Sequence, residues 1–314
     1  MAGSPKLRHY SKRALTPMLG AAAARLGYTL VPGGPLSPVP ALKPPGDSDW
    51  RYRYPLHGIE LDLDAQLAFL ERELSRYTRE FEQEVRGAKF ELWNGLYQAG
   101  DAETLYALVR FLRPRRILEI GSGNSTVVTS AACEANARDH VDTDFVSVDP
   151  EPRRPVDSLP GLRRFEQIDC RTLPLGRFQQ LEPGDILFID TEHVVKRGSE
   201  VNWLVLEALP TVAPGVWVHF HDIFLPYDYP FWLYWRTFPT EQYLLHALLL
   251  ESGWRVELSL AALFADRRAE LRQLIPSLSE QVPGNAALET WYPSGFWIRR
   301  SADHRPAAMR THGT

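Results

Sequence analysis

Short, almost wholly apolar runs alternate in the second half of the chain with stretches of helical periodicity. Runs of four to eight apolar residues fit strands that are buried on both faces of a sheet. Helices between such strands favour a mainly parallel, doubly wound α/β sheet. We expect strands in residues 116–120, 145–149, 162–168, 185–190, 215–222, 254–260 and 295–299.

Two amphipathic helices are predicted before the first run. In residues 62–86 the apolar side chains recur at spacings of three and four, with acids and arginines between them. This stripe has two interpretations: a helix packed on its own domain, or a homodimer contact through the N-terminal helix. The second helix ends at Pro114, and Asp101 can cap its start.

The two ends of the chain lack these patterns. Prolines are frequent in residues 32–45 and cannot lie inside a helix or a central strand, which predicts a Pro-rich arm over residues 1–56. Residues 57–100 then form a helical extension, and the polar residues 301–314 form a disordered tail. The basic residues before residues 14–24 are loosely signal-like, but Pro17 and Gly20 interrupt that apolar run and favour a short amphipathic helix.

Composition narrows the class of protein. The chain has 314 residues, 44% of them hydrophobic, which is enough for a large core. A net charge of −4 with mixed signs does not suggest nucleic acid as a partner. There is no apolar run of the length of a membrane span. Two cysteines, Cys133 and Cys170, make no disulfide framework and fit reduced thiols in the cytoplasm.

A glycine-rich turn follows the first predicted strand, in the sequence RILEIGSGNST of residues 116–126. Gly121-Ser122-Gly123 permits a tight turn and close approach of a ligand to the backbone. Ser125 or Thr126 can cap the helix expected from Val127. A strand, a glycine turn and a helix N-terminus form the nucleotide-binding corner of a doubly wound sheet.

Acidic residues lie within or just after most of the predicted strands. In open α/β sheets, ligands bind outside the carboxyl ends of the strands. Carboxylates gathered there suit a ligand with hydroxyls, an amine or a positive charge. The five acids are Glu119, Asp149, Asp169, Asp190 and Asp222.

The ordered set of motifs resembles class I S-adenosylmethionine-dependent methyltransferases. Residues 119–123, EIGSG, resemble the first motif of that family, E/D-x-G-x-G, and Asp149 and Asp169 resemble its acids of the second and third strands. The resemblance implies a methyltransferase domain over residues 101–300. It also implies a Rossmann-like, seven-stranded sheet whose last strand, in GFWIRR, is antiparallel. The segments GDILFIDTEH and HFHDIFLPYDYP are similar to methyltransferases of natural products and sugars.

The resemblance also implies roles in binding S-adenosyl-L-methionine. Gly121 and Gly123 would lie against its methionine part, Glu119 would favour its ammonium group, and Asp149 would accept hydrogen bonds from both ribose hydroxyls. Pairing of Glu119 with Arg115 or Arg116, and plain turn chemistry for Asp149, are the structural alternatives. Asp169 would accept from the adenine amino group, with Cys170 beside the ring; Ser122, Asn124, Ser125 and Asp190 complete the expected cofactor-binding set.

Methylation of a small-molecule hydroxyl needs a group that takes the hydroxyl proton. We expect His193 to be this base. Metal-dependent O-methyltransferases resemble the chain at Asp190, His221 and Asp222, although His221 stands where a carboxylate is usual. Imidazole there favours Mn²⁺, Fe²⁺ or Zn²⁺ over Mg²⁺. Two alternatives remain: a metal-free site with His193 or His221 as the base, and a buried hydrogen-bonded corner at residues 219–222.

The sequence is also compatible with other functions, and with other roles for one of its loops. Residues 224–232 form an aromatic loop that fits either an acceptor pocket or core packing. A NAD-dependent oxidoreductase would suit Asp149, but the third glycine of its fingerprint is missing. A non-catalytic binding protein with the same fold is the remaining alternative.

Overall fold

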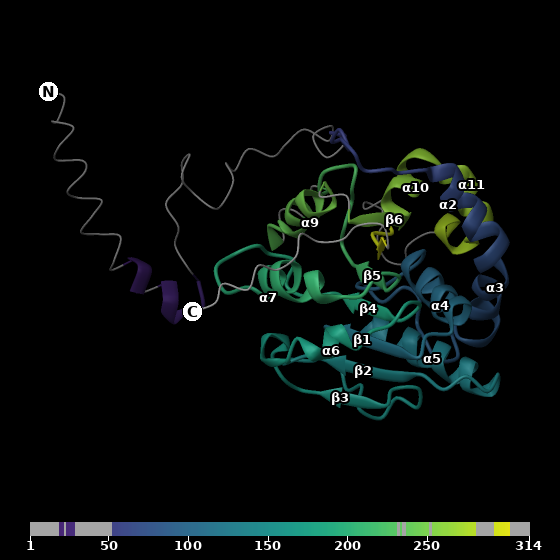
Figure 1. Cartoon of the computed structure of the whole chain (residues 1–314), viewed down its shortest axis with the longest axis horizontal. Helices are drawn as coiled ribbons and strands as arrows, with labels where there is room; N and C mark the ends of the chain where they lie inside the picture. The colour runs from purple at the N-terminus through teal and green to yellow at the C-terminus, as the bar shows by residue number, and fades with distance from the viewer. Residues whose placement is uncertain are drawn as a thin grey trace, which may run out of the picture. The chain divides into compact units, whose positions relative to one another are not determined.

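The computed structural model divides the chain into two units, residues 1–46 and 47–314. The residues that it describes are 19–21, 23–28, 52–230, 233, 237–250, 253–280 and 292–301 (Figure 1). Most of the predicted arm, and the predicted tail after residue 301, lie outside these residues. The fold and the site below belong to the second unit.

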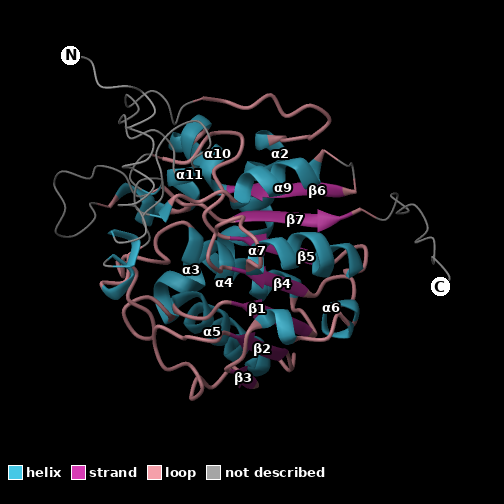
Figure 2. Cartoon of the chain, turned by 90° about the vertical axis from the view of Figure 1, so that its left-hand side faces the viewer, coloured by secondary structure: helices cyan, strands magenta, loops and turns pink. Residues whose placement is uncertain are grey.

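Seven strands form one sheet in the order β3-β2-β1-β4-β5-β7-β6. The pairs from β3 to β5 are parallel, and β7 is antiparallel to both of its neighbours (Figure 2). This confirms the predicted sheet with its reversed last strand. The strands are β1 (Arg116–Ile120), β2 (Asp144–Val148), β3 (Arg164–Glu166), β4 (Ile186–Ile189), β5 (Trp217–Phe220), β6 (Trp254–Ser259) and β7 (Phe296–Arg300).

The central strands are apolar throughout because both faces of the sheet are covered. On β1, Ile117 belongs to one core cluster, whereas Leu118 and Ile120 belong to the other. Each such side chain contributes about 1.5–3 kcal/mol by leaving water. Helices therefore pack on each side of the sheet. Because both faces are covered, the ends of the strands are where the sheet opens to solvent.

The first core cluster contains the helices α3 (Ser75–Glu84), α4 (Asp101–Leu112), α5 (Asn124–Arg138), α10 (Leu260–Asp266) and α11 (Arg268–Leu274). The second contains α6 (Gly176–Gln179), α7 (Glu200–Trp203) and α9 (Glu241–Leu249). In Figure 1, α3, α4 and α5 lie to the right of the strands, and α6, α7 and α9 lie to the left. Short π and 3-10 turns complete the list: η2 (Leu70–Leu74), η3 (Cys170–Thr172), η4 (Leu204–Ala208), η5 (Leu209–Thr211) and η6 (Pro276–Ser279).

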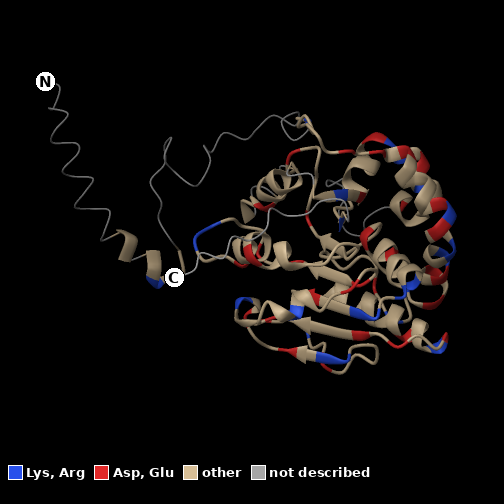
Figure 3. Ribbon diagram, viewed as in Figure 1, with Lys and Arg blue, Asp and Glu red and all other residues tan. Residues whose placement is uncertain are grey.

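The helical extension runs through α2 (Leu63–Phe69), η2 and α3. Asp62 caps it by accepting a hydrogen bond from the backbone N–H of Ala65. Its stripe is buried against α4, where the rings of Phe81 and Tyr106 lie 5.6 Å apart. The apolar stripe is thus buried within the domain. The outward side of α2 and α3 carries charges of both signs (Figure 3).

Several predicted boundaries were wrong, for local reasons. The helix after the glycine turn begins at Asn124, with Gly123 as its N-cap residue; Thr126 contributes to the cap from the first turn, where its hydroxyl accepts from the backbone N–H of Gly123. Asp101 does not cap α4, because Gly100 holds that place. The third strand covers only Arg164–Glu166 of the predicted residues 162–168.

The carboxylate of Asp101 is instead buried and accepts hydrogen bonds from the backbone N–H groups of Ser294 and Gly295. It thereby ties α4 to the start of β7. Among the described residues, no helix is both long and apolar enough to span a membrane.

Candidate active site

A cavity of about 970 Å³ opens at the carboxyl ends of β1, β2, β4 and β5. This volume lies at the upper end of the range for small-ligand sites, about 300–1,000 Å³. Two of the predicted site residues, Glu119 and Asp169, are not part of its wall. The wall brings together the others: Gly121, Ser122, Gly123, Asn124, Ser125, Asp149, Cys170, Asp190, His193, His221 and Asp222.

The two glycines of the turn meet different demands. Gly121 has φ = +88°, and a Cβ atom there would lie 1.8 Å from the carbonyl oxygen of Asp190. Gly121 is therefore required by the neighbouring strand end. A Cβ atom on Gly123 would meet no atom within 4 Å. The backbone at Gly123 is open to the cavity, as close approach of a ligand requires.

Glu119 lies beneath the turn. Its carboxylate, 1% exposed, accepts hydrogen bonds from the hydroxyls of Ser125 and Thr126 at 2.9 and 2.8 Å. Burial raises its pKa to about 7. Arg115 and Arg116 pair with other acids, so the alternative pairing does not occur. Glu119 holds the first turn of α5 in place instead of facing the cavity.

Asp149 is fixed at the cavity wall by backbone groups. One of its carboxylate oxygens accepts from the backbone N–H and the hydroxyl of Ser122, at 2.7 and 2.9 Å. The other accepts from the backbone N–H of Glu151 at 2.8 Å. These contacts hold the carboxylate in one orientation at the end of β2, where ribose hydroxyls are expected to donate.

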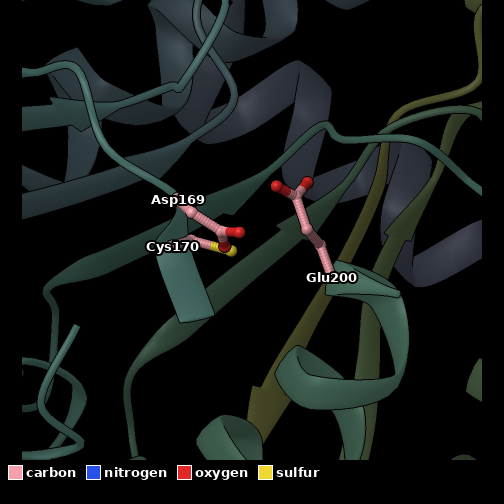
Figure 4. Close-up of side chains that lie close together, drawn as sticks. All are labelled: Asp169, Cys170 and Glu200. Atoms are coloured by element: carbon pink, nitrogen blue, oxygen red, sulfur yellow. The ribbon is translucent and has the colours of Figure 1, made fainter. Parts of the chain in front are cut away.

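Asp169, Cys170 and Glu200 lie close together at another part of the site (Figure 4). Among the described residues, they form a group whose three potential metal ligand atoms lie within 4.8 Å of one another. However, the guanidinium of Arg171 binds the Asp169 carboxylate and lowers its pKa. Burial raises the pKa of the Cys170 thiol, which opposes the thiolate that a metal needs. We therefore do not interpret this group as a metal site: Cys170 and Glu200 line the cavity, whereas Asp169 pairs with Arg171 outside its wall.

Two histidines and two aspartates meet where β4 and β5 end. These strands pair in parallel, and the backbone N–H of His221 donates to Ile189, which places the two ends side by side. The Nε2 atom of His193 lies 3.2 Å from Oδ1 of Asp190 and 3.7 Å from Oδ2 of Asp222. The Nδ1 atom of His221 lies 3.6 and 3.8 Å from the other oxygens of these carboxylates.

Two further carboxylates complete this cluster, and neither was among the predicted site residues. Oε2 of Glu241 lies 2.9 Å from Nδ1 of His193, and Oδ2 of Asp101 lies 3.6 Å from Nε2 of His221. Both acids are 1% exposed. Each stands at a helix start, where an acid is common for electrostatic reasons, so the sequence offers no signal of a second partner.

The charged groups of this cluster shift one another's pKa values. Burial lowers the pKa of both His193 and His221, but the facing carboxylates outweigh it and raise each pKa well above its usual value. Burial raises the pKa of Asp190, but the two histidines outweigh it and lower this pKa well below its usual value. Burial raises the pKa of Asp101 and of Glu241. The cluster therefore favours the cationic form of both imidazoles in the resting site.

His193 and Asp222 both have left-handed backbones, each with φ = +56°. This conformation is uncommon for residues other than glycine and costs roughly 1 kcal/mol or more. Two hydrogen bonds hold this conformation at His193: its carbonyl oxygen accepts from the backbone N–H groups of Thr240 and Glu241. Such strain often accompanies functional sites.

His219 has no part in this cluster. Its ring lies against Phe188 and Trp297, at 4.3 and 4.5 Å between ring centroids. Neither ring nitrogen has a hydrogen-bond partner, and burial lowers its pKa well below the usual value. His219 is a neutral core residue.

The aromatic loop supports the core interpretation in the part that the structure describes. Phe224 and Tyr229 are buried in the first core cluster, and none of residues 224–230 lines the cavity. Residues 231 and 232 lie outside the described part. Tyr97, from the helical extension, does line the cavity, and its ring centroid lies 4.9 Å from that of His221.

The expected metal ligands fit a divalent cation in their chemistry. Asp190, His221 and Asp222 offer two carboxylates and an imidazole, which suit Mn²⁺, Fe²⁺ or Zn²⁺. Their spacing is wider than in a formed centre: ligands bound at about 2.1 Å lie roughly 3 Å apart, whereas the distances here are 3.6 and 3.8 Å. Among the described residues, the ligand atoms of these three do not all lie within 4.8 Å of one another, so the side chains would have to move to bind one ion.

Solved structures of CmcI are similar to this chain. An apo structure of CmcI is similar at 14% identity, over 71% of this chain and 84% of that chain, with a TM-score of 0.39. A CmcI structure with Mg and SAM is similar at 15% identity, over the same shares of the two chains, with a TM-score of 0.35. No curated protein gives a match.

The family comparison coincides with the site. Residues 118–223 match the model of a family described as a methyltransferase domain. This stretch begins in β1 and ends just after β5, and so spans the glycine turn, Asp149, Asp190 and the His221-Asp222 pair. Residues 118–223 are therefore a methyltransferase domain, and the sheet order with its reversed β7 agrees with the class I, S-adenosylmethionine-dependent type that the sequence motifs resemble.

Proposed function

We propose that this enzyme transfers the methyl group of S-adenosylmethionine to a hydroxyl group of a small molecule, such as a sugar or another natural product. One observation carries the proposal. His193, Asp190 and Asp222 line the same cavity as the glycine turn and Asp149. A proton-accepting cluster therefore shares one space with the expected cofactor site.

The cofactor takes the part of the cavity nearest β1 and β2. Its methionine part lies against the open backbone at Gly123, and its ribose hydroxyls donate to Asp149. Cys170 lies beside the adenine ring. The acidic residues of the wall also suit the positive sulfonium: Asp149, Glu151, Asp190, Glu192, Glu200 and Asp222.

The acceptor takes the part nearest β4 and β5, with its hydroxyl oxygen aligned with the S–CH₃ bond. Holding this alignment supplies much of the acceleration. The S–CH₃ bond breaks as the O–CH₃ bond forms, and the hydroxyl proton passes to Nε2 of His193. The sulfonium becomes a neutral thioether. The imidazolium that forms is stabilised by Asp190, Asp222 and Glu241.

His193 must lose its resting proton before it can accept another. Its raised pKa therefore makes the productive form more abundant as the pH increases. His221 is the second candidate for the base, but it is 4% exposed and its Nε2 faces Asp101. His193 is nearer to the open part of the cavity and is preferred.

A divalent cation, if bound, would be held by Asp190, His221 and Asp222. It would supply Lewis acidity that lowers the pKa of the acceptor hydroxyl. The roles of the cofactor-binding residues do not depend on it.

Calorimetry and a transfer assay test the proposal together. We expect S-adenosylmethionine to bind and NAD not to bind. We also expect a labelled methyl group to reach an oxygen atom in a panel of sugars and phenols. Absence of S-adenosylmethionine binding at millimolar concentration contradicts the proposal. Transfer to nitrogen or carbon compounds alone contradicts its O-methylation part.

A further inference from the structure

The first turn of α9 reaches back to the loop after β4. The backbone N–H groups of Thr240 and Glu241 donate to the carbonyl of His193, at 2.9 and 3.1 Å. The hydroxyl of Thr240 accepts from the backbone N–H of Val195 at 2.7 Å. This turn therefore holds the backbone from the carbonyl of His193, the left-handed residue, to the N–H of Val195.

The side chain of Glu241 also contacts His193. Its Oε2 atom lies 2.9 Å from Nδ1 of His193, while its buried Oε1 atom has no hydrogen-bond partner among the residues that the structure describes. A carboxylate that served only the helix N-terminus would gain more by facing solvent or backbone N–H groups. Burial of a half-satisfied carboxylate against one ring nitrogen points to a specific role toward that ring.

We infer that Glu241 is a positioning residue: by accepting the Nδ1 proton, it holds the His193 ring so that Nε2 faces the cavity between Asp190 and Asp222. The inference rests on the proposed function only for the use of Nε2 as a base. A ring nitrogen is a reliable proton acceptor only when the other one has a fixed partner. In this arrangement Nδ1 stays protonated whether or not Nε2 carries a proton.

Nuclear magnetic resonance of the full chain, with ¹⁵N-labelled histidine, tests the inference without an acceptor. We expect a strongly deshielded, slowly exchanging Nδ1 proton from His193, assigned by its loss in His193→Gln. Glu241→Gln removes or markedly shifts this signal. Glu103→Gln is the matched control, because Glu103 is also 1% exposed, lies in the first turn of α4 and accepts a backbone N–H. The control keeps the signal unchanged.

An unchanged Nδ1 signal in folded Glu241→Gln overturns the inference. If that variant does not fold, Glu241→Asp withdraws the carboxylate by one methylene, and the same comparison applies. Calorimetry with S-adenosylmethionine separates the two hypotheses. Binding within about twofold of wild type in Glu241→Gln supports a role confined to His193, and a tenfold loss contradicts it. Failure of the wild-type chain to bind contradicts the proposed function and leaves the NMR result valid.

Discussion

The position that a Cβ atom would take on Gly121 lies 1.8 Å from the carbonyl oxygen of Asp190. The glycine motif after β1 therefore packs directly against the residue that follows β4. Gly123, two residues later, has free space at the same position. One glycine shapes the fold, and the other leaves room for a ligand.

This contrast predicts opposite effects of two alanine substitutions. Gly121→Ala places a methyl group on backbone and imposes a strained φ, so we expect a loss of several kcal/mol of stability. Gly123→Ala should keep its melting temperature and lose about tenfold or more in affinity for S-adenosylmethionine. Thermal denaturation and calorimetry measure the two effects. A Gly121→Ala variant as stable as wild type would contradict the explanation.

Two acids at neighbouring strand ends are predicted to differ in cofactor binding. Asp149→Asn removes a charged acceptor from the cavity wall, and we expect affinity for S-adenosylmethionine to fall about 10- to 100-fold, as for loss of a charged hydrogen bond. Asp169→Asn is the matched control and should change it less than about threefold, because Asp169 is outside the wall and pairs with Arg171. A large loss in Asp169→Asn would instead support the adenine contact expected from the sequence.

Methyl transfer is predicted to increase with pH. The pKa of His193 is raised well above 6.5, so its unprotonated form grows only as the pH passes that raised value. We expect kcat/KM to increase from pH 6 to pH 9, and this increase to disappear in His193→Gln with cofactor affinity intact. His246→Gln, a variant of a histidine outside the cavity wall, should retain both. A profile that falls over this range would exclude His193 as the base.

Stability should respond to pH through a buried acid outside the site. The pKa of Glu103 is raised by burial from 4.5 to about 7, so its stabilising contribution is complete below about pH 4.5 and is lost as the pH rises to about 7. Glu103→Gln should therefore reduce the loss of unfolding free energy between pH 5 and pH 8 by up to roughly 3 kcal/mol. Urea denaturation of wild type and Glu103→Gln at the two pH values measures this loss of unfolding free energy. Identical losses in both proteins would refute the assignment.

Metal binding is predicted to favour borderline cations. The imidazole of His221 replaces an oxygen ligand, so Mn²⁺ or Zn²⁺ should bind more tightly than Mg²⁺. Asp222→Asn should weaken this binding, and treatment with EDTA should lower turnover. Calorimetry with each cation on the metal-stripped protein checks the order. Tighter binding of Mg²⁺, or no binding at all, would favour the metal-free alternative.

The sequence by itself determined the sheet and part of the cavity wall. The alternation of apolar runs with helical stretches specified the strands, since a strand buried on both faces must be apolar throughout. Because ligands bind at the carboxyl ends of such strands, residues placed just after them, such as Asp149 and Asp190, could be assigned to the cavity in advance. Both lie there.

Only the tertiary structure decided which side chains face the cavity and which partners they have. Glu119 turns beneath the helix it precedes, because two hydroxyls there satisfy it. Asp169 is taken by Arg171. Glu241 reaches His193 across 48 residues, a contact between strand and helix ends that no local pattern encodes. The order of residues fixes local periodicity, whereas pairing of buried charges depends on how distant elements pack.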